Sequence, residues 1–97
     1  ESFDWRVRKI IGDQFITSVD SVGANIAEGY GRFHYLDKVR FYYNARGSLL
    51  ESRHWLGLLL ERKLISNTHA KKYLDIYKDL RIILNGLINS AMKAKIG

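Results

Sequence analysis

Apolar residues recur every three or four positions through the first third of the chain and form one continuous stripe along a helix. The stripe consists of Phe3, Val7, Ile10, Ile11, Phe15, Val19, Val22 and Ile26. Polar residues fall on the opposite side, as a half-buried helix requires: Arg6, Lys9, Asp13, Thr17 and Asp20. We predict an amphipathic helix over residues 3–28. Gly12 and Gly23 each cost this helix about 1 kcal/mol relative to alanine, a cost that a closely approaching backbone would offset.

The middle of the chain carries two apolar tracks instead of one. The first track contains Val39, Tyr42, Ala45, Leu49, Leu56 and Leu60. The second contains Phe41, Ala45, Ser48, Trp55 and Leu59. Because two tracks need two neighbours, the helix predicted over 36–64 is either the central helix of a bundle or also part of an interface between subunits.

In the last third of the chain, apolar residues recur at alternating intervals of four and three residues. This spacing forms a seam along one side of a helix and is typical of helix packing in antiparallel bundles. Its members are Tyr73, Tyr77, Leu80, Leu84, Leu87, Ala91 and Ala94. A third helix is therefore predicted over 68–94, with a side-chain oxygen from Ser66, Asn67 or Thr68 as its cap. Short connections make successive helices antiparallel. The sequence thus predicts one all-α domain over 1–97, an antiparallel up-down bundle of three long helices.

Two glycines mark the connection between the first and second helices. Gly29 and Gly31 can adopt the positive φ that ends a helix and reverses the chain. Asn25, Glu28 and Arg32 place three hydrogen-bonding side chains beside this turn, where backbone groups lack helical partners. We expect these three side chains to form a buried polar clamp at the turn.

Composition excludes several classes of protein. The 97 residues contain neither cysteine nor proline, so disulfides, thiolate zinc sites and cysteine nucleophiles are excluded. The sequence has neither an apolar run of roughly 18 residues nor a signal-peptide pattern, so we expect a cytoplasmic protein without a membrane partner. Sixteen Lys and Arg against ten Asp and Glu give a net charge of +6. Such a balance attracts nucleic acid, anionic lipid or an acidic protein, or forms only the solvated surface of a bundle.

The sequence offers little support for catalysis. The three histidines are scattered and form no metal-binding pair: His34, His54 and His69. Glu28 and Glu51 could form a carboxylate pair, but we favour neutralisation of Arg32 or Arg46, or capping of the turn. Ser48 lies in no nucleophile elbow, and the two glycines of the turn follow a helix instead of a strand. We therefore predict a protein that is not an enzyme, with no catalytic residue, no metal site and no cofactor.

Two sequence blocks carry a resemblance to a known family. The first is SVGANIAEGYGR at residues 21–32, and the second is RFYYNARGSLLE at residues 40–51. In order and separation they resemble the bacterial 23S rRNA intervening-sequence proteins, and the resemblance covers most of the chain. The motif residues that it identifies are Asn25, Glu28, Gly29, Arg32, Gly47, Ser48 and Glu51, and Gly31 joins this set as the second glycine of the predicted turn.

The resemblance implies a small four-helix bundle that assembles into a homopentamer and has no established molecular role. A related family, the accessory proteins of diversity-generating retroelements, binds nucleic acid and a reverse transcriptase. Two departures stand out. Val22 and Gly23 occupy positions where members commonly have Ile-Pro, and the further N-terminal helix of the family does not precede Phe3. Three helices can be counted here, or four if that N-terminal helix is included.

Two functional hypotheses follow from these observations. In the first, a homo-oligomer binds RNA or DNA backbone through exposed basic side chains: Arg6, Lys9, Lys38, Arg40, Arg46, Arg53, Lys71, Lys72, Lys78 and Arg81. In the second, the protein is an oligomeric scaffold that binds other proteins without nucleic acid. Its subunit or partner contacts would use exposed aromatic side chains: Trp5, Phe33, Tyr35, Tyr42, Tyr43 and Trp55.

Overall fold

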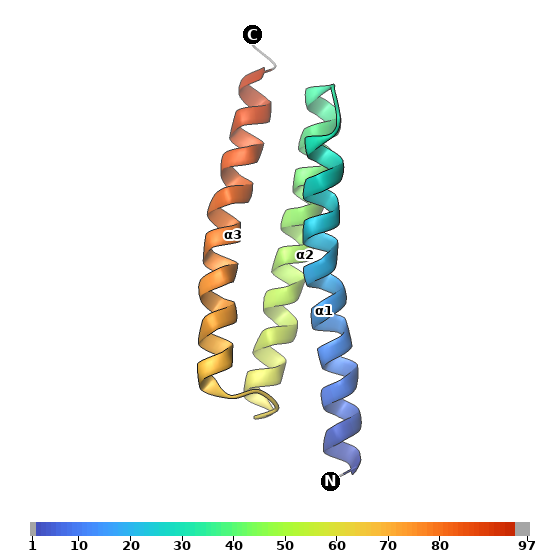
Figure 1. Ribbon diagram of the computed structural model, residues 1–97, viewed down its shortest axis with the longest axis vertical. Coiled ribbons are helices and arrows are strands. Elements are labelled where there is room, and N and C mark those ends of the chain that lie inside the picture. The colour runs from blue at the N-terminus through green and yellow to red at the C-terminus, as the bar shows by residue number, and fades with distance from the viewer. Residues whose placement is uncertain (1, 95–97) are drawn as a thin grey trace.

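The computed structural model describes the backbone of residues 2–94 and the side chains of residues 5–94, so the predicted place of Phe3 in the apolar stripe lies outside the described side chains. The chain forms three helices, α1 (Ser2–Tyr30), α2 (Tyr35–Glu61) and α3 (Asn67–Ala94) (Figure 1). Residues 2–94 contain no strand. The predicted all-α helical bundle is therefore confirmed.

The three helices run up, down and up, with α2 between the other two (Figure 1). The α1–α2 turn lies at the same end of the bundle as the end of α3, and the α2–α3 connection lies at the other end. Helix α2 packs against both neighbours, whereas no Cα atom of α1 lies within 8 Å of a Cα atom of α3. The two apolar tracks predicted for α2 thus correspond to two neighbouring helices of the same chain.

The buried core lies where the three helices converge. Its members come from all of them: Val22, Tyr42, Ala45, Leu49, Leu84, Ile88 and Ala91. The first predicted stripe is only partly buried, because Ile11 and Val22 are covered while Ile10 and Val19 are exposed. Helix α1 therefore presents apolar side chains that the described chain leaves uncovered.

The connections end the helices differently from the sequence-based prediction. Neither Gly29 nor Gly31 has a positive φ, and α1 continues through Tyr30. The positive φ of 58° belongs instead to Lys63, after α2 has ended at Glu61. The amide of Leu64 donates to the Leu59 carbonyl at 2.8 Å, and the amide of Lys63 donates to the Leu60 carbonyl at 3.0 Å. This is the paired Schellman pattern of a helix C-terminus, and it stops α2 before the predicted Leu64.

Two caps begin the second and third helices. The imidazole Nδ1 of His34 accepts from the amide of Leu36 at 3.2 Å, at the start of α2. The hydroxyl of Ser66 accepts from the amide of His69 at 3.2 Å, at the start of α3. The Ser66 contact confirms one of the three predicted caps, while the histidine cap was not predicted.

A neighbouring helix approaches closely at Gly29, for which the sequence analysis predicted a turn conformation instead. A Cβ built on Gly29 would lie 2.6 Å from Cε1 of Tyr42 and 3.1 Å from Cβ of Phe41. The expectation of close approach at Gly12 and Gly23 is wrong, since no atom would lie within 4 Å of a Cβ there. Gly29 is thus required by helix packing and not by a left-handed backbone.

Tyr42 is a core residue, and its expected exposure as an interface aromatic is wrong. Its side chain is only 3% exposed, because the ring packs over Gly29 where α1 and α2 meet. Burial raises the pKa of the Tyr42 phenol above its usual value of 10.0, and the nearby Tyr30 phenol raises it further. The residue therefore stabilises the α1–α2 contact in its protonated form.

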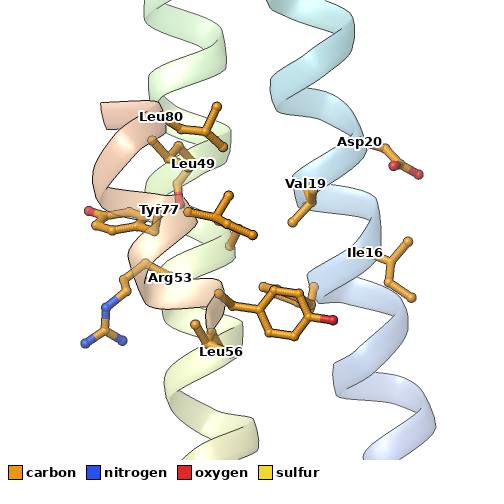
Figure 2. A pocket seen from close by; sticks show the side chains of 12 residues that line it. Ile16, Val19, Asp20, Leu49, Arg53, Leu56, Tyr77 and Leu80 are labelled. Carbon is orange, nitrogen blue, oxygen red and sulfur yellow. Dashed lines mark hydrogen bonds between the residues drawn. The ribbon is translucent and has the colours of Figure 1, made fainter. Parts of the chain in front are cut away.

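An apolar groove separates α1 from α3 on one side of the bundle. It has a volume of about 240 Å³. Figure 2 shows Val19 of α1 pointing toward Leu49 of α2 and Tyr77 of α3, while Asp20 and Arg53 point away at opposite edges. The rings of Phe15 and Tyr73 bridge the two helices edge to face, with centroids 5.3 Å apart. None of the described helices combines the length and hydropathy that a membrane span requires.

Candidate nucleic-acid interface

Three basic residues share one face of α3. Lys71 and Lys78 lie seven residues apart, and Arg81 follows after three more, so their side chains leave the helix on the same side. Asn85 continues this face four residues later. All four residues are exposed. From Lys71 to Asn85 the face extends roughly 21 Å at the helical rise of about 1.5 Å per residue.

Helix α2 brings two arginines to this face. A guanidinium nitrogen of Arg46 donates to Oδ1 of Asn85 at 3.1 Å, which fixes the position of Arg46 against α3. Arg53 lies seven residues further on α2 and so shares its face. Because α2 and α3 are antiparallel, Arg53 comes level with Lys78, seven residues before Asn85. We call this surface the α2/α3 stripe and define it by five residues: Arg46, Arg53, Lys71, Lys78 and Arg81.

Ion pairs within the described residues neutralise little of the positive charge. Lys9 pairs with Asp13 and Lys71 with Asp75, each at 3.0 Å; the two looser pairs are Arg32–Glu28 at 3.1 Å and Arg40–Asp37 at 4.0 Å. All are exposed pairs within one helix or turn, which contribute about 0.2–1 kcal/mol each. Such weak pairs leave the cations available to a competing polyanion.

The other predicted basic residues lie away from the stripe. Arg6 and Lys9 are exposed near the start of α1, at the end of the bundle opposite the α1–α2 turn (Figure 1). Lys72 is exposed on another side of α3, about 100° around the helix from Lys71. Lys38 and Arg40 lie at the start of α2. The structure therefore places five of the predicted cations on the α2/α3 stripe and two at the start of α2, and it separates Arg6, Lys9 and Lys72 from both groups.

A second cluster combines cations and aromatic rings at the α1–α2 turn. The guanidinium groups of Arg32 and Arg40 lie 4.9 and 4.8 Å from the centroid of the Phe41 ring. The Lys38 ammonium lies 5.6 Å from the centroid of Tyr30 and donates to the Tyr30 carbonyl at 3.0 Å. Phe33, between these groups in sequence, is fully exposed. We call this the turn cluster and define it by six residues: Tyr30, Arg32, Phe33, Lys38, Arg40 and Phe41.

The predicted buried polar clamp at the turn is wrong. Glu28 and Arg32 pair with each other four residues apart on the surface, with side chains 58% and 44% exposed. Asn25 turns back along its own helix and donates to the Ser21 carbonyl at 2.9 Å and to the Ser21 hydroxyl at 3.2 Å. Each side chain thus finds a partner four residues away along the chain, the spacing at which helical side chains meet, and the three do not share one site.

The two motif blocks meet through serines further along the helices. The hydroxyls of Ser21 on α1 and Ser48 on α2 are 2.8 Å apart and share a hydrogen bond. They lie in a shallow polar depression lined by Ser21, Asn25, Tyr43, Asn44, Gly47, Ser48 and Glu51. The expected neutralisation of Arg46 by Glu51 is wrong, because Arg46 instead contacts Asn85 and lies over the Tyr43 ring at 4.6 Å. Glu28 does neutralise Arg32 as expected.

The aromatic residues predicted for subunit contacts differ in exposure. Trp5, Phe33 and Tyr43 are exposed, Tyr35 and Trp55 are half-buried, and Tyr42 is in the core. Trp55 has a buried Nε1 with no hydrogen-bond acceptor among the described residues. Within residues 5–94, no three His, Asp or Glu side chains come together in a way that could hold a metal ion.

Three residues of these surfaces escaped the sequence analysis. Asn85 carries no charge and gave no signal, although it connects Arg46 to α3. Phe41 directly follows the predicted cation Arg40, whereas Tyr30 lies between two glycines, and the cations Arg32 and Lys38 reach these rings from across the turn. The adjacent pair Arg40-Phe41 was the one local signal that could have indicated an arginine–aromatic contact.

Comparison with known proteins places this geometry in a family. The family model described as 23S rRNA-intervening sequence protein matches residues 1–86. Searches of curated proteins and of solved structures give no significant match. The match covers both motif blocks, the α1–α2 turn, the whole of α2 and most of α3. The chain therefore belongs to the 23S rRNA-intervening sequence protein family.

Proposed function

We propose that this protein is a non-enzymatic homo-oligomer that binds the backbone of RNA or DNA. The observation that carries the proposal is the α2/α3 stripe, in which five cations from two helices share one surface. Its length of roughly 21 Å equals the rise of about six base pairs at about 3.4 Å each. The family description, which names an rRNA intervening sequence, is compatible with nucleic-acid association.

Backbone contact is the mode of binding that this surface favours. Lysine and arginine side chains bind phosphates as cations and release condensed counterions, which makes affinity fall steeply with salt. We therefore expect binding with a strong salt dependence and little dependence on sequence.

The first prediction is that removing two stripe lysines weakens binding more than removing two others. In Lys71→Ala/Lys78→Ala, two phosphate contacts are lost, so the slope of log K against log salt becomes shallower by about 1.8 on duplex and about 1.4 on single strands. Fluorescence anisotropy of labelled RNA and DNA, titrated across salt, measures this slope.

The matched control is Lys9→Ala/Lys72→Ala. It removes the same charge as the stripe variant. Lys9 matches Lys71, because each forms an ion pair of 3.0 Å with an aspartate four residues later, and Lys72 matches Lys78, because neither belongs to the ion pairs described. Both control lysines lie away from the stripe, so their loss should leave the slope close to that of the unmodified protein. Equal effects of the two double variants, or no binding at low salt, would contradict the proposal.

Exposed apolar side chains support the proposed oligomerisation. The groove between α1 and α3 includes exposed Ile16, Val19 and Ile76, and α3 adds exposed Ile83. Apolar surface of this extent marks contact sites in soluble proteins. The resemblance to the family suggests five subunits. The alternative function is an oligomeric scaffold that binds other proteins; it rests on the same apolar surface and does not require the stripe.

The second prediction concerns the mass of the protein in solution. Light scattering or mass photometry at micromolar concentration should give a multiple of the 11.3 kDa chain mass, about five times that value for a pentamer. Ile16→Glu places a charge on the groove and should shift the population toward the monomer, whereas Thr17→Glu, next to it on another side of α1, should not. A monomeric unmodified protein would rule out oligomerisation.

A further inference from the structure

The turn cluster combines exposed aromatic rings with basic side chains. Phe33 is fully exposed and Tyr30 is 75% exposed, so both rings offer apolar surface to a ligand. Arg32, Lys38 and Arg40 lie around them and outnumber the carboxylates Glu28 and Asp37 by one charge. Next to Phe33, the rings of His34 and Tyr35 stack on each other with centroids 5.2 Å apart and an interplanar angle of 21°.

The cations of the cluster are held in place before any ligand binds. Both guanidinium groups lie over Phe41, at 4.9 and 4.8 Å from its centroid. Lys38 is held by the carbonyls of Tyr30 at 3.0 Å and Gly29 at 3.4 Å, which close the end of α1. Side chains fixed in this way lose less conformational entropy on binding than free ones.

Exposed rings among fixed cations favour nucleic acid over a protein partner. Aromatic and arginine side chains are also common in protein interfaces, but lysine is depleted there, and aromatic platforms beside several positive charges are typical of proteins that bind single strands. Bases within a duplex are already stacked on their neighbours, so only unpaired bases can lie against a protein ring.

We propose that the turn cluster stacks unpaired bases of single-stranded RNA or DNA on Phe33 and Tyr30, while Arg32, Lys38 and Arg40 contact the adjacent phosphates. This inference rests on the proposed nucleic-acid binding and names its substrate class. The α2/α3 stripe supplies binding to any backbone, and the turn cluster adds a preference for strands with free bases. Each stacked base adds roughly tenfold to the affinity.

An abasic strand separates the two proposals, because it keeps the phosphates and lacks the bases. With one base on each of the two rings, the unmodified protein should bind a normal single strand roughly a hundredfold more tightly than an abasic strand of equal length. Phe33→Ala should reduce this difference about tenfold, because only the base on Tyr30 then stacks, while leaving the salt slope on the abasic strand unchanged. Phe33→Trp should preserve the preference, and the fluorescence of the new indole should be quenched by the normal strand alone.

Trp5→Ala is the matched control, since it removes another exposed aromatic side chain at the opposite end of the bundle (Figure 1). It should retain the full preference for the normal strand. Equal affinity of the unmodified protein for normal and abasic strands would overturn the stacking proposal and leave backbone binding intact. Equal losses in Phe33→Ala and Trp5→Ala would also overturn it. Absence of binding to every strand at low salt would overturn both proposals.

Discussion

Leu84→Ala is expected to lower the free energy of unfolding by about 2–5 kcal/mol. Leu84 is 0% exposed and lies in the core where α3 meets residues of both other helices, among them Val22 and Leu49. Truncation removes three buried carbon atoms and leaves a cavity that helices anchored along their whole length cannot fill. A domain of this size has roughly 5–15 kcal/mol of stability, so one substitution removes a large part of it.

Ile82→Ala is the control for this prediction. It removes the same number of carbon atoms from the same helix, but Ile82 is 67% exposed, so the expected loss is within about 0.5 kcal/mol. Urea denaturation followed by far-ultraviolet circular dichroism measures both variants, at one fixed protein concentration because assembly would add to stability. Equal losses would mean that the outer face of α3 is as well covered in the folded assembly as the core.

The helices were predictable because each has its own apolar periodicity. The seam through Leu84, Leu87 and Ala91 identified the buried side of α3. The two tracks of α2 indicated two neighbours, which the structure shows to be α1 and α3, although a subunit interface was the other alternative. What periodicity could not show is how deeply each residue is covered. Ile10 and Val19 fit the stripe of α1 as well as Val22 does, but α3 is too far from α1 to cover them.

The turn was predicted at the right place and for the wrong physical reason. A glycine near a helix end suggests a positive φ, because that is its commonest use there. Gly29 is instead needed because Tyr42 occupies the space of a side chain, a contact between residues 13 apart that no local pattern reveals. The residue with a positive φ is Lys63, which sequence alone would not single out.

The candidate interface was partly predictable for a similar reason. Charge and exposure identified ten basic residues, but their grouping depends on the register of α2 against α3, fixed by the Arg46–Asn85 contact. Helical spacing alone would have joined Lys71, Lys78 and Arg81. It could not have brought Arg46 and Arg53 beside them.

Gly29→Val is expected to cost about 3 kcal/mol, at the upper end of the range for overpacking a closely packed site. Its Cβ would lie 2.6 Å from Cε1 and 2.9 Å from Cδ1 of Tyr42, and its γ-methyl groups extend beyond that. The Tyr42 ring cannot move into solvent, because it is 3% exposed within the core. The main chain of α2 cannot yield easily either, since Phe41 Cβ is 3.1 Å from the same position.

Gly23→Val is the matched control, because it makes the same chemical change within α1 at a position with no atom within 4 Å of the new Cβ. Valine forms helix slightly better than glycine, so this variant should be as stable as the unmodified protein or slightly more so. Denaturation curves of both variants separate the packing effect from the change in helix propensity. If Gly29→Val were as stable as Gly23→Val, the close contact between α1 and α2 would be wrong.

A double variant tests whether Tyr42 is the cause of the cost at Gly29. Tyr42→Leu shortens the side chain and removes Cε1, the ring atom nearest to the new Cβ. Tyr42→Leu alone should be destabilising, since it leaves space in the core. Combined with Gly29→Val, it should lose less stability than the sum of the single losses, by about 0.5–3 kcal/mol. Additive losses would instead assign the cost to the backbone beside Phe41, and the α1–α2 packing would then depend on main-chain spacing and not on the tyrosine ring.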